Sequence, residues 1–396
     1  MAANETGFKP MLPSTNVSHP IREIARFGEV SVLVGEGDEH VLQRDANIIR
    51  LDGRGPFRVV VQKGRSFQRA NPHIPVLVDR GRYLIVAYSR ELDVQHEGVH
   101  FSMALADAES VGFREERAVP VPRNPAVTAA LQRISAAALK SKVETLAALH
   151  TRHARLPAFE PALAISKEWL ETASCEVERV ELPMPGGRTA NLIGHRLGQA
   201  ADRKLFVVGA HLDSINHEDG PDAAAPGADD NASGCATIGA MAQAIADESL
   251  QHDVQFVLFG GEEEGLFGSK HFVSRMSAAD RKRLAGAINI DMAASRNTPD
   301  RAVLLEGAPV SRHVIDGLVR AAATYTSLLT QVSLQPFSSD HVPFIEQGLA
   351  AVLTIEGTDS AFEHEHTARD TPDRLDFELH REITSMNLAW LLEQTL

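Results

Sequence analysis

Five short motifs contain residues whose types and spacing could bind metal ions and activate a water molecule. A dinuclear metal hydrolase needs a His ligand with a carboxylate behind it, a carboxylate that can bridge two cations, and a pair of adjacent carboxylates. One carboxylate of that pair binds metal, and the other takes the proton of the attacking water. The motifs that supply these groups are His211-Leu212-Asp213, Gly227-Ala228-Asp229-Asp230, Glu262-Glu263-Glu264, Asn289-Ile290-Asp291 and His364-Glu365-His366.

Three of these motifs follow short apolar runs that are typical of buried strands. The runs cover residues 205–210, 254–259 and 285–290, and they lead to His211, to Glu262 after two glycines, and to Asp291. Each motif alone is a weak signal, since a lone His-x-Asp is usually a surface coincidence and three acidic residues in a row are usually solvated. In open α/β sheets, however, ligands bind beyond the carboxyl ends of the strands. The shared position of the three motifs therefore predicts one metal site at the edge of a sheet.

The order of the motifs resembles that of the di-zinc exopeptidases of clan MH. The sequence contains His-x-Asp, Gly-Ala-Asp-Asp-x-Ala-Ser-Gly, Glu-Glu-x-Gly-Leu-x-Gly-Ser, Asn-x-Asp-Met, Ser-Asp-His and His-Thr-x-x-Asp-Thr in this order. That family includes bacterial leucine aminopeptidases and enzymes of the glutamate carboxypeptidase II type, and the match covers about residues 134–396. The resemblance implies an α/β fold, in which a mixed, mostly parallel sheet is flanked by helices and carries two zinc ions.

The resemblance also implies a role for each residue of the motifs. The implied zinc ligands are His211 and Asp291 for one ion, Glu263 and His366 for the other, and Asp230 as the bridge between them. Glu262 is implied as the general base. Asp213 is implied as the carboxylate that accepts the other ring N–H of His211 and fixes its tautomer. Asp229 and His364 stay open as alternatives to the bridging carboxylate and the second imidazole.

The implied reaction is the release of an N-terminal residue from a peptide or aminoacyl substrate. Two zinc ions share a water and lower its pKa. Glu262 takes a proton from this water, which becomes a hydroxide, and passes the proton to the leaving amine. Cobalt or manganese could replace zinc in such a ligand set. A carboxypeptidase, a dipeptidase or an N-acyl amino acid amidohydrolase could use the same site. A single-zinc glutaminyl cyclase fits less well because both ligand sets are intact, and a catalytically inactive binding module is the alternative of another class.

One departure from the family concerns the group that stabilises the oxyanion. Many relatives use a Tyr hydroxyl, either shortly before Ser-Asp-His or directly before the last His ligand. Here residues 334–338 contain no Tyr, and Glu365 precedes the last His. Tyr325, His341 or a backbone N–H could take over this role, or zinc alone could suffice; we expect Asp340 to support the site from behind.

The composition restricts the partners of the chain. Its 396 residues are 43% hydrophobic and carry a formal net charge of −14, which argues against nucleic acid or an anionic membrane as a partner. No run of 18 apolar residues and no signal peptide is visible. We therefore expect a cytoplasmic protein, or a secreted or periplasmic one if a signal was removed. Cys175 and Cys235 are expected to be free, and the oligomeric state stays open.

The pattern along the chain predicts four segments. They are a polar arm over residues 1–20, a mainly-β accessory domain over 21–119, a Pro-rich linker over 120–125 and the zinc exopeptidase catalytic domain over 126–396. The histidines of the β domain (His40, His73, His96 and His100) lack ligand spacing, so that domain is expected to be structural. The catalytic domain is expected to open with one helix over 126–155 and a second over 162–173.

Overall fold

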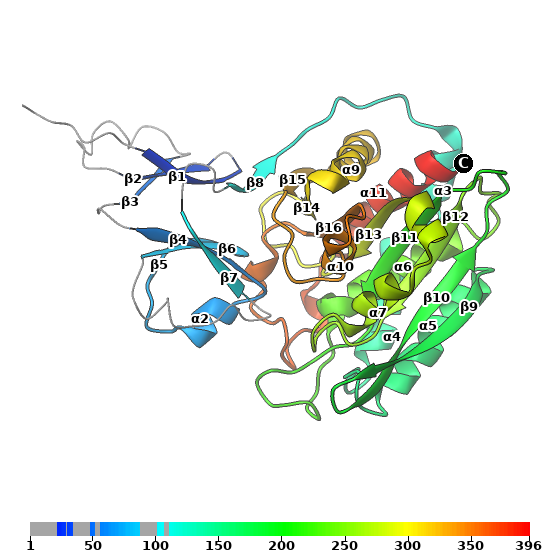
Figure 1. Ribbon diagram of the computed structural model, residues 1–396, viewed down its shortest axis with the longest axis horizontal. Helices are drawn as coiled ribbons and strands as arrows, with labels where there is room; N and C mark the ends of the chain where they lie inside the picture. The colour runs from blue at the N-terminus through cyan, green and yellow to red at the C-terminus, as the bar shows by residue number, and fades with distance from the viewer. Residues whose placement is uncertain (1–21, 29, 35–47, 52–55, 88–100, 107–110) are drawn as a thin grey trace, which may run out of the picture.

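The computed structural model describes residues 22–28, 30–34, 48–51, 56–87, 101–106 and 111–396 (Figure 1). The predicted polar arm lies outside the described residues, as do His40, His96 and His100; His73 is exposed. Within the described part of the chain, every helix is too short or too polar to cross a lipid bilayer.

A 12-stranded mixed sheet forms the centre of the molecule, with the strand order β3-β2-β1-β8-β15-β14-β16-β13-β11-β12-β10-β9. Four neighbouring strands in its middle run parallel. They are β12 (Asp253–Phe259), β11 (Leu205–His211), β13 (Leu284–Ile290) and β16 (Ala351–Glu356). The antiparallel strands β9 (Glu176–Met184) and β10 (Gly187–Arg196) close one edge, and β14 (Ala302–Glu306) and β15 (Leu329–Ser333) continue the sheet on the other side. The predicted α/β class is therefore confirmed.

Helices cover both faces of this part of the sheet, as Figure 1 shows. Side chains alternate along a strand, so Phe206 and Val208 pack on one face and Leu205 and Val207 on the other. The first face is covered by α3 (Pro125–Leu131), α4 (Ala136–Ala147), α5 (Phe159–Thr172), α6 (Gly234–Ala244), α9 (Arg312–Tyr325) and α11 (Phe377–Thr395). The second is covered by α7 (Phe267–Arg275) and α10 (Val342–Glu346), and the short helix α8 (Ala278–Arg283) follows α7.

The N-terminal strands lie beside the α/β region and share a core with it (Figure 1). β8 (Val111–Glu115) pairs with β15, and β1 (Arg22–Phe27), β2 (Val30–Val34) and β3 (Ile48–Leu51) extend the same sheet. A second sheet contains β5 (Val76–Arg80), β6 (Tyr83–Ala87), β4 (Phe57–Gln62) and β7 (Phe101–Leu105), and α2 (Ser66–Ala70) follows β4. Leu304, Leu353 and Ile355 of the central sheet pack with Phe27 and Tyr83 in one apolar cluster. The domain boundary at residues 119–126 stays a prediction, and the main sheet continues across it.

The three apolar runs before the motifs are the strands β11, β12 and β13, as predicted. The single helix over 126–155 is wrong, because α3 ends at Leu131 and α4 covers only Ala136–Ala147. The hydroxyl of Ser135 accepts a hydrogen bond from the backbone N–H of Ala138 and caps a new helix at this point. The apolar stripe runs across the break, so periodicity alone could not reveal it.

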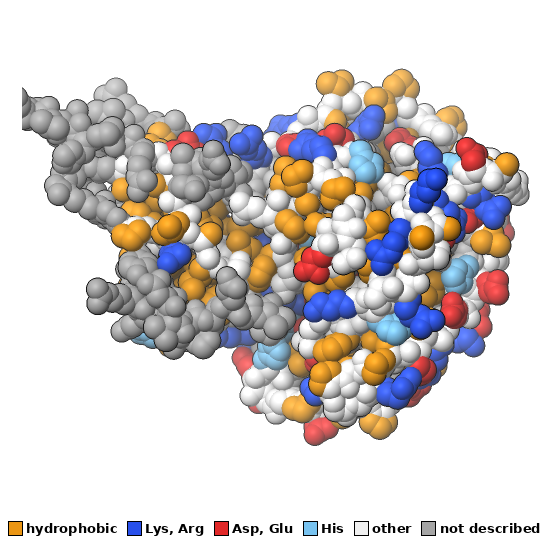
Figure 2. All heavy atoms as spheres, in the orientation of Figure 1, with side chains coloured by type: hydrophobic (Ala, Val, Ile, Leu, Met, Phe, Trp, Pro, Cys, Tyr) orange, Lys and Arg blue, Asp and Glu red, His pale blue; other side chains and the backbone are white. Residues whose placement is uncertain are grey.

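The remaining sequence expectations concern cysteines and charge. Cys175 and Cys235 are buried and free, and the Cys235 thiol donates to the backbone carbonyl of His211 at 3.0 Å. Figure 2 shows both basic and acidic side chains on the described part of the face in view.

Candidate metal centre

Strand ends and two loops bring the motif residues to one edge of the central sheet. His211 is the last residue of β11, and Asp291 directly follows β13. Glu262 lies three residues beyond β12, after Gly261 with a φ of +80°. Asp230 lies in the tight turn Ala228–Ser233 before α6, and His366, with a φ of +58°, lies in the segment after β16. The positive φ of His366 is unusual for a side chain with a Cβ, and it marks a backbone that the surrounding contacts hold in place.

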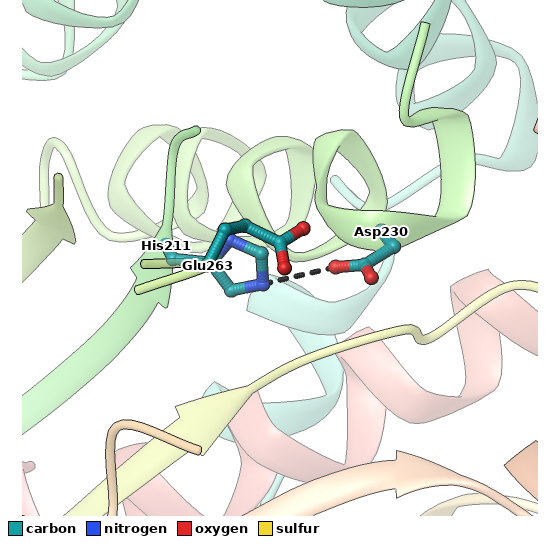
Figure 3. Close-up of side chains that lie close together, drawn as sticks. All are labelled: His211, Asp230 and Glu263. Atoms are coloured by element: carbon teal, nitrogen blue, oxygen red, sulfur yellow. Dashed lines mark ion pairs between the residues drawn. The ribbon is translucent and has the colours of Figure 1, made fainter. Parts of the chain in front are cut away.

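Two sets of atoms that could bind metal ions share Asp230. In the first set, Nε2 of His211 lies 3.0 Å from Oδ1 of Asp230 and 3.1 Å from Oδ1 of Asp291. In the second, Nε2 of His366 lies 3.0 Å from Oδ2 of Asp230 and 3.0 Å from Oε2 of Glu263. Figure 3 shows the ring of His211 pointing at the Asp230 carboxylate, with Glu263 beside it. Each oxygen of Asp230 therefore faces a different imidazole.

These residues fit a pair of zinc ions. Ligands that bind one zinc ion at about 2 Å approach one another to about 3 Å, which is the spacing within each set. Both oxygens of Asp230 and both of Glu263 are buried, and none has a hydrogen bond of regular geometry within the described residues. Each of these buried carboxylates faces an imidazole Nε2 at 3.0 Å, and a metal ion between imidazole and carboxylate would give the carboxylate charge a further positive partner. Imidazole and carboxylate are also ligands that zinc prefers.

Glu262 and Glu263 are adjacent but have opposite pKa shifts. Burial raises the pKa of Glu262 to about 8, although Lys63 and His211 oppose this. Burial and Asp230 act in the same direction on Glu263, but His366 and Lys63 outweigh them and lower its pKa to about 2. Glu263 is therefore ionised, as a ligand must be, whereas Glu262 is closer to the range suited to proton transfer near neutral pH. Two adjacent carboxyl groups whose pKa values differ in this way are typical of a metal ligand next to a general base.

Asp213 lies behind the centre, but its contacts differ from the expected ones. The Nδ1–H of His211 donates to the backbone carbonyl of Asp213 at 3.2 Å, and the Asp213 carboxylate is 3.8 Å from that nitrogen. The carboxylate instead accepts the backbone N–H groups of Glu262 at 3.3 Å and Glu263 at 3.2 Å. The carbonyl thus fixes the His211 tautomer that presents Nε2 to a metal, and the carboxylate positions the Glu262-Glu263 pair.

A second buried carboxylate, that of Asp370, positions Asp230. Its two oxygens accept the backbone N–H groups of Asp229 at 2.9 Å and Asp230 at 3.0 Å. Another carboxylate of this segment, that of Asp376, caps α11 by accepting the backbone N–H groups of Glu378 and Leu379. Asp370 therefore contacts the metal centre rather than the helix.

The two alternative ligands lie away from the imidazole–carboxylate sets. One oxygen of Asp229 accepts the backbone N–H of Ala294 at 3.0 Å, and the Asp229 carboxyl group forms a hydrogen bond with the carboxyl group of Glu356. The ring of His364 packs edge-on against Phe362, 5.5 Å from its centroid, and is partly exposed. This arrangement favours Asp230 and His366 as ligands.

The residues suggested as oxyanion donors contact other groups. The Tyr325 hydroxyl accepts the backbone N–H of Asn124 at 3.0 Å, at the end of α9. Nε2 of His341 lies 3.4 Å from a carboxylate oxygen of Glu306. The buried carboxyl of Asp340 has a pKa raised to about 8 by burial and by Glu262, so it is a neighbour of the centre.

Lys63 is a residue of the centre that the sequence analysis did not identify. Its ammonium lies 3.1 Å from Oε2 of Glu262 and 3.6 Å from Oε2 of Glu263, and its side chain is 6% exposed. It follows β4 in the N-terminal region, 199 residues before Glu262. A lone Lys in Gln62-Lys63-Gly64 has no spacing that ties it to the motifs, so no sequence signal pointed to it.

Comparisons with known proteins concern the family and the fold of the chain. Residues 191–391 match the family model described as Peptidase family M28. Aminopeptidase YwaD of Bacillus subtilis is 30% identical over 174 residues, 43% of this chain and 37% of the relative. Leucine aminopeptidase 1 of Blastomyces gilchristii is 30% identical over 278 residues, 64% of this chain and 69% of the relative. The matched part thus spans little more than a third of the first relative and about two thirds of the second.

Solved structures show the same fold. BSAP, a zinc aminopeptidase from Bacillus subtilis, superposes with a TM-score of 0.59 at 18% identity, covering 66% of this chain and 95% of that structure. The LapA aminopeptidase of Legionella pneumophila superposes with a TM-score of 0.62 at 18% identity, covering 86% of this chain and 98% of LapA. At this identity the likeness concerns the fold alone. The LapA comparison extends the shared fold into the N-terminal part of the chain.

Proposed function

Because this chain belongs to peptidase family M28, we propose that it is a co-catalytic di-zinc metallo-aminopeptidase. The observation that carries the proposal is the shared carboxylate of Asp230, whose two oxygens each face a different imidazole at 3.0 Å. Relatives named aminopeptidases support an enzyme of the metallo-exopeptidase class. The substrate would be a peptide or aminoacyl compound with a free N-terminus.

The residues divide the reaction between metal binding and proton transfer. Two bound zinc ions would lower the pKa of a shared water and polarise the scissile carbonyl. The residues that would hold them are His211 and Asp291, His366 and Glu263, and Asp230 between the two pairs. One oxygen of Glu262 lies within 4.8 Å of ligand atoms of His211 and Asp291 without belonging to either 3.0 Å set. Glu262 would accept the water's proton and return it to the leaving amine.

Glu365 supports a substrate with a free amine. Both of its carboxylate oxygens are buried without a hydrogen-bond partner in the described residues, and Oε1 lies 3.6 Å from Nε2 of His366. Burial raises the pKa of Glu365 to about 8, so its ionised form lacks a sufficient positive partner. The ammonium group of a substrate N-terminus would supply one.

The arginines that could hold a substrate carboxylate are engaged elsewhere. Arg296 and Arg301 both contact Asp376, at 3.8 and 3.4 Å, and Arg369 pairs with Glu218 at 2.9 Å on the surface. A carboxypeptidase would need such a group for the free C-terminus of its substrate. The occupied arginines therefore favour the aminopeptidase over this rival.

The experiment that tests the function is hydrolysis of a peptide panel by the full chain loaded with zinc. The panel contains peptides with free and with acetylated N-termini, each with a free or amidated C-terminus. We expect chelator-sensitive release of unblocked N-terminal residues, and a loss of about a hundredfold or more in kcat for Glu262→Gln. Glu264→Gln is the matched control, because Glu264 pairs with Arg155 at 2.9 Å and not with a ligand. Hydrolysis only of N-acetylated peptides, or only of peptides with a free C-terminus, would contradict the aminopeptidase.

A further inference from the structure

The N-terminal β region places one charged side chain in the metal centre. The Lys63 ammonium donates hydrogen bonds to both carboxylate oxygens of Glu262, at 3.1 and 3.3 Å. The same nitrogen lies 3.6 Å from Oε2 of Glu263. All three side chains are nearly completely buried. The β region is therefore part of the wall around the reacting groups and is not only a neighbouring module.

Specific contacts hold this part of the β region against the catalytic residues. Gly64 has a φ of +55°, and a Cβ added there would lie 2.6 Å from a carboxylate oxygen of Glu365, so the turn packs directly on the segment of the last His. The hydroxyl of Ser360 donates to the backbone carbonyl of Gln62 at 3.4 Å. Nearby, the buried guanidinium of Arg82 contacts Asp359 at 3.3 Å. These contacts fix the point from which the Lys63 side chain extends.

Other buried cations of the described residues face away from the carboxylate pair. Arg152 donates to the backbone carbonyls of Leu212 and Gly227, at 2.9 and 3.0 Å. Arg82 contacts Asp359 and, at 3.9 Å, Glu306. Within the described ranges, Lys63 is thus the buried cation whose ammonium touches Glu262.

We propose that Lys63 is a catalytic residue, whose ammonium donates a hydrogen bond to the carbonyl oxygen of the substrate as negative charge develops on it. This inference rests on the proposed aminopeptidase function. In the step concerned, the water oxygen bonds to the carbonyl carbon, the water proton moves to Glu262, and the π-electron pair moves onto the carbonyl oxygen. When the C–N bond then breaks, the electron pair re-forms the carbonyl and the amine leaves with the proton from Glu262.

The chemistry of Lys63 suits this role. An oxyanion is stabilised most by donors that are already in place within a site from which water is excluded. An ammonium is a strong charged donor, and its flexible four-carbon stem lets it move from Glu262 to a substrate oxygen beside it.

Two other roles for Lys63 predict different results. If the ammonium held the free carboxylate of the substrate, its removal would raise KM only for peptides with a free C-terminus. If it blocked the centre, its removal would raise turnover. An oxyanion donor acts in the transition state, so its removal lowers kcat on every substrate and leaves KM nearly unchanged.

The test compares Lys63→Met, Lys63→Arg and the wild type, all as the full zinc-loaded chain. Lys142→Met is the matched control, since Lys142 lies over the Trp169 ring at 4.3 Å, away from the centre. Kinetics use peptides with free and amidated C-termini. Zinc per chain is measured by atomic absorption. Calorimetry measures binding of an α-aminophosphonic acid, which carries a tetrahedral anionic group, and of the matching free amino acid.

We expect Lys63→Met to lose about 100- to 1,000-fold in kcat with KM within threefold, while Lys63→Arg retains more turnover than Lys63→Met. Aminophosphonate binding should weaken at least tenfold, with amino acid binding and zinc content unchanged. Unchanged or higher turnover, an effect confined to free C-termini, or a parallel loss of zinc would each overturn the inference while the aminopeptidase stands. A zinc-loaded wild type that cleaves no peptide would instead overturn the proposed function, and the inference with it.

Discussion

Substitution of Asp370 tests whether the bridging carboxylate is held in place from behind. Asp370→Ala removes the acceptors of two buried N–H groups, those of Asp229 and Asp230. Leaving a buried donor unpaired costs about 1–3 kcal/mol, so the loss of both should lower the free energy of unfolding by about 2–6 kcal/mol. The backbone carbonyl of Asp370 still accepts from Ala228 in the variant, so the segment itself remains attached.

Urea unfolding of the metal-free protein, followed by circular dichroism, measures this free energy without a contribution from zinc. A zinc titration measures affinity separately, and it should weaken by about 10- to 100-fold because Asp230 is no longer positioned. Asp373→Ala is the control, since Asp373 is exposed on the same segment and should change stability by less than about 0.5 kcal/mol. A loss of less than about 1 kcal/mol relative to that control, together with unchanged zinc affinity, would refute the reasoning.

Three further predictions concern the metal, the β4 turn and pH. Chelation should lower the melting temperature measured by calorimetry, because zinc binds only the folded centre; at a thousand times Kd this binding contributes about 4 kcal/mol, and an unchanged melting temperature would contradict the metal site. Gly64→Ala should reduce kcat and stability more than Gly348→Ala, because both glycines have a positive φ but only Gly64 faces Glu365; equal effects would exclude that contact. Burial lowers the pKa of His380 to about 4, whereas in the unfolded chain it is about 6.5. Above pH 6.5 the residue is neutral in both states, so it does not lower the free energy of unfolding. At pH 5 it is protonated in the unfolded chain but not in the folded one, so the free energy of unfolding should be lower by about 2 kcal/mol. Urea unfolding at pH 7 and pH 5 should show this difference in the wild type and a smaller one in His380→Gln, and equal pH dependence would contradict it.

Local sequence patterns predicted the site residues that lie at the carboxyl ends of strands. An apolar run identifies a buried strand, and the residue after it must lie at the carboxyl edge of the sheet, so His211 and Asp291 could be placed together. The helix over 126–155 was misjudged because one capping hydroxyl, that of Ser135, starts a new helix without disturbing the apolar period. Local periodicity describes which face is buried, but it does not show where backbone hydrogen bonds are interrupted.

Contacts between distant segments could not be predicted in this way. Asp213 was expected to accept a hydrogen bond from the ring of His211, yet its carboxylate accepts the backbone N–H groups of Glu262 and Glu263, which follow β12. Lys63 reaches Glu262 across 199 residues and from another sheet. The place of Asp213 behind the centre was predicted, but its partners and the contact of Lys63 depend on how loops and sheets pack, for which the motifs carry no signal.

The continuous sheet has a consequence for how this chain tolerates shortening. β8 covers one side of β15, and the N-terminal strands cover the apolar side chains of Leu304, Leu353 and Ile355. A protein cut at the Pro-rich segment would expose an unpaired strand edge next to a bare apolar surface, which is a template for aggregation. A truncated catalytic half is therefore expected to be insoluble before its activity can be judged. The N-terminal strands therefore protect the sheet that carries the metal centre from aggregation.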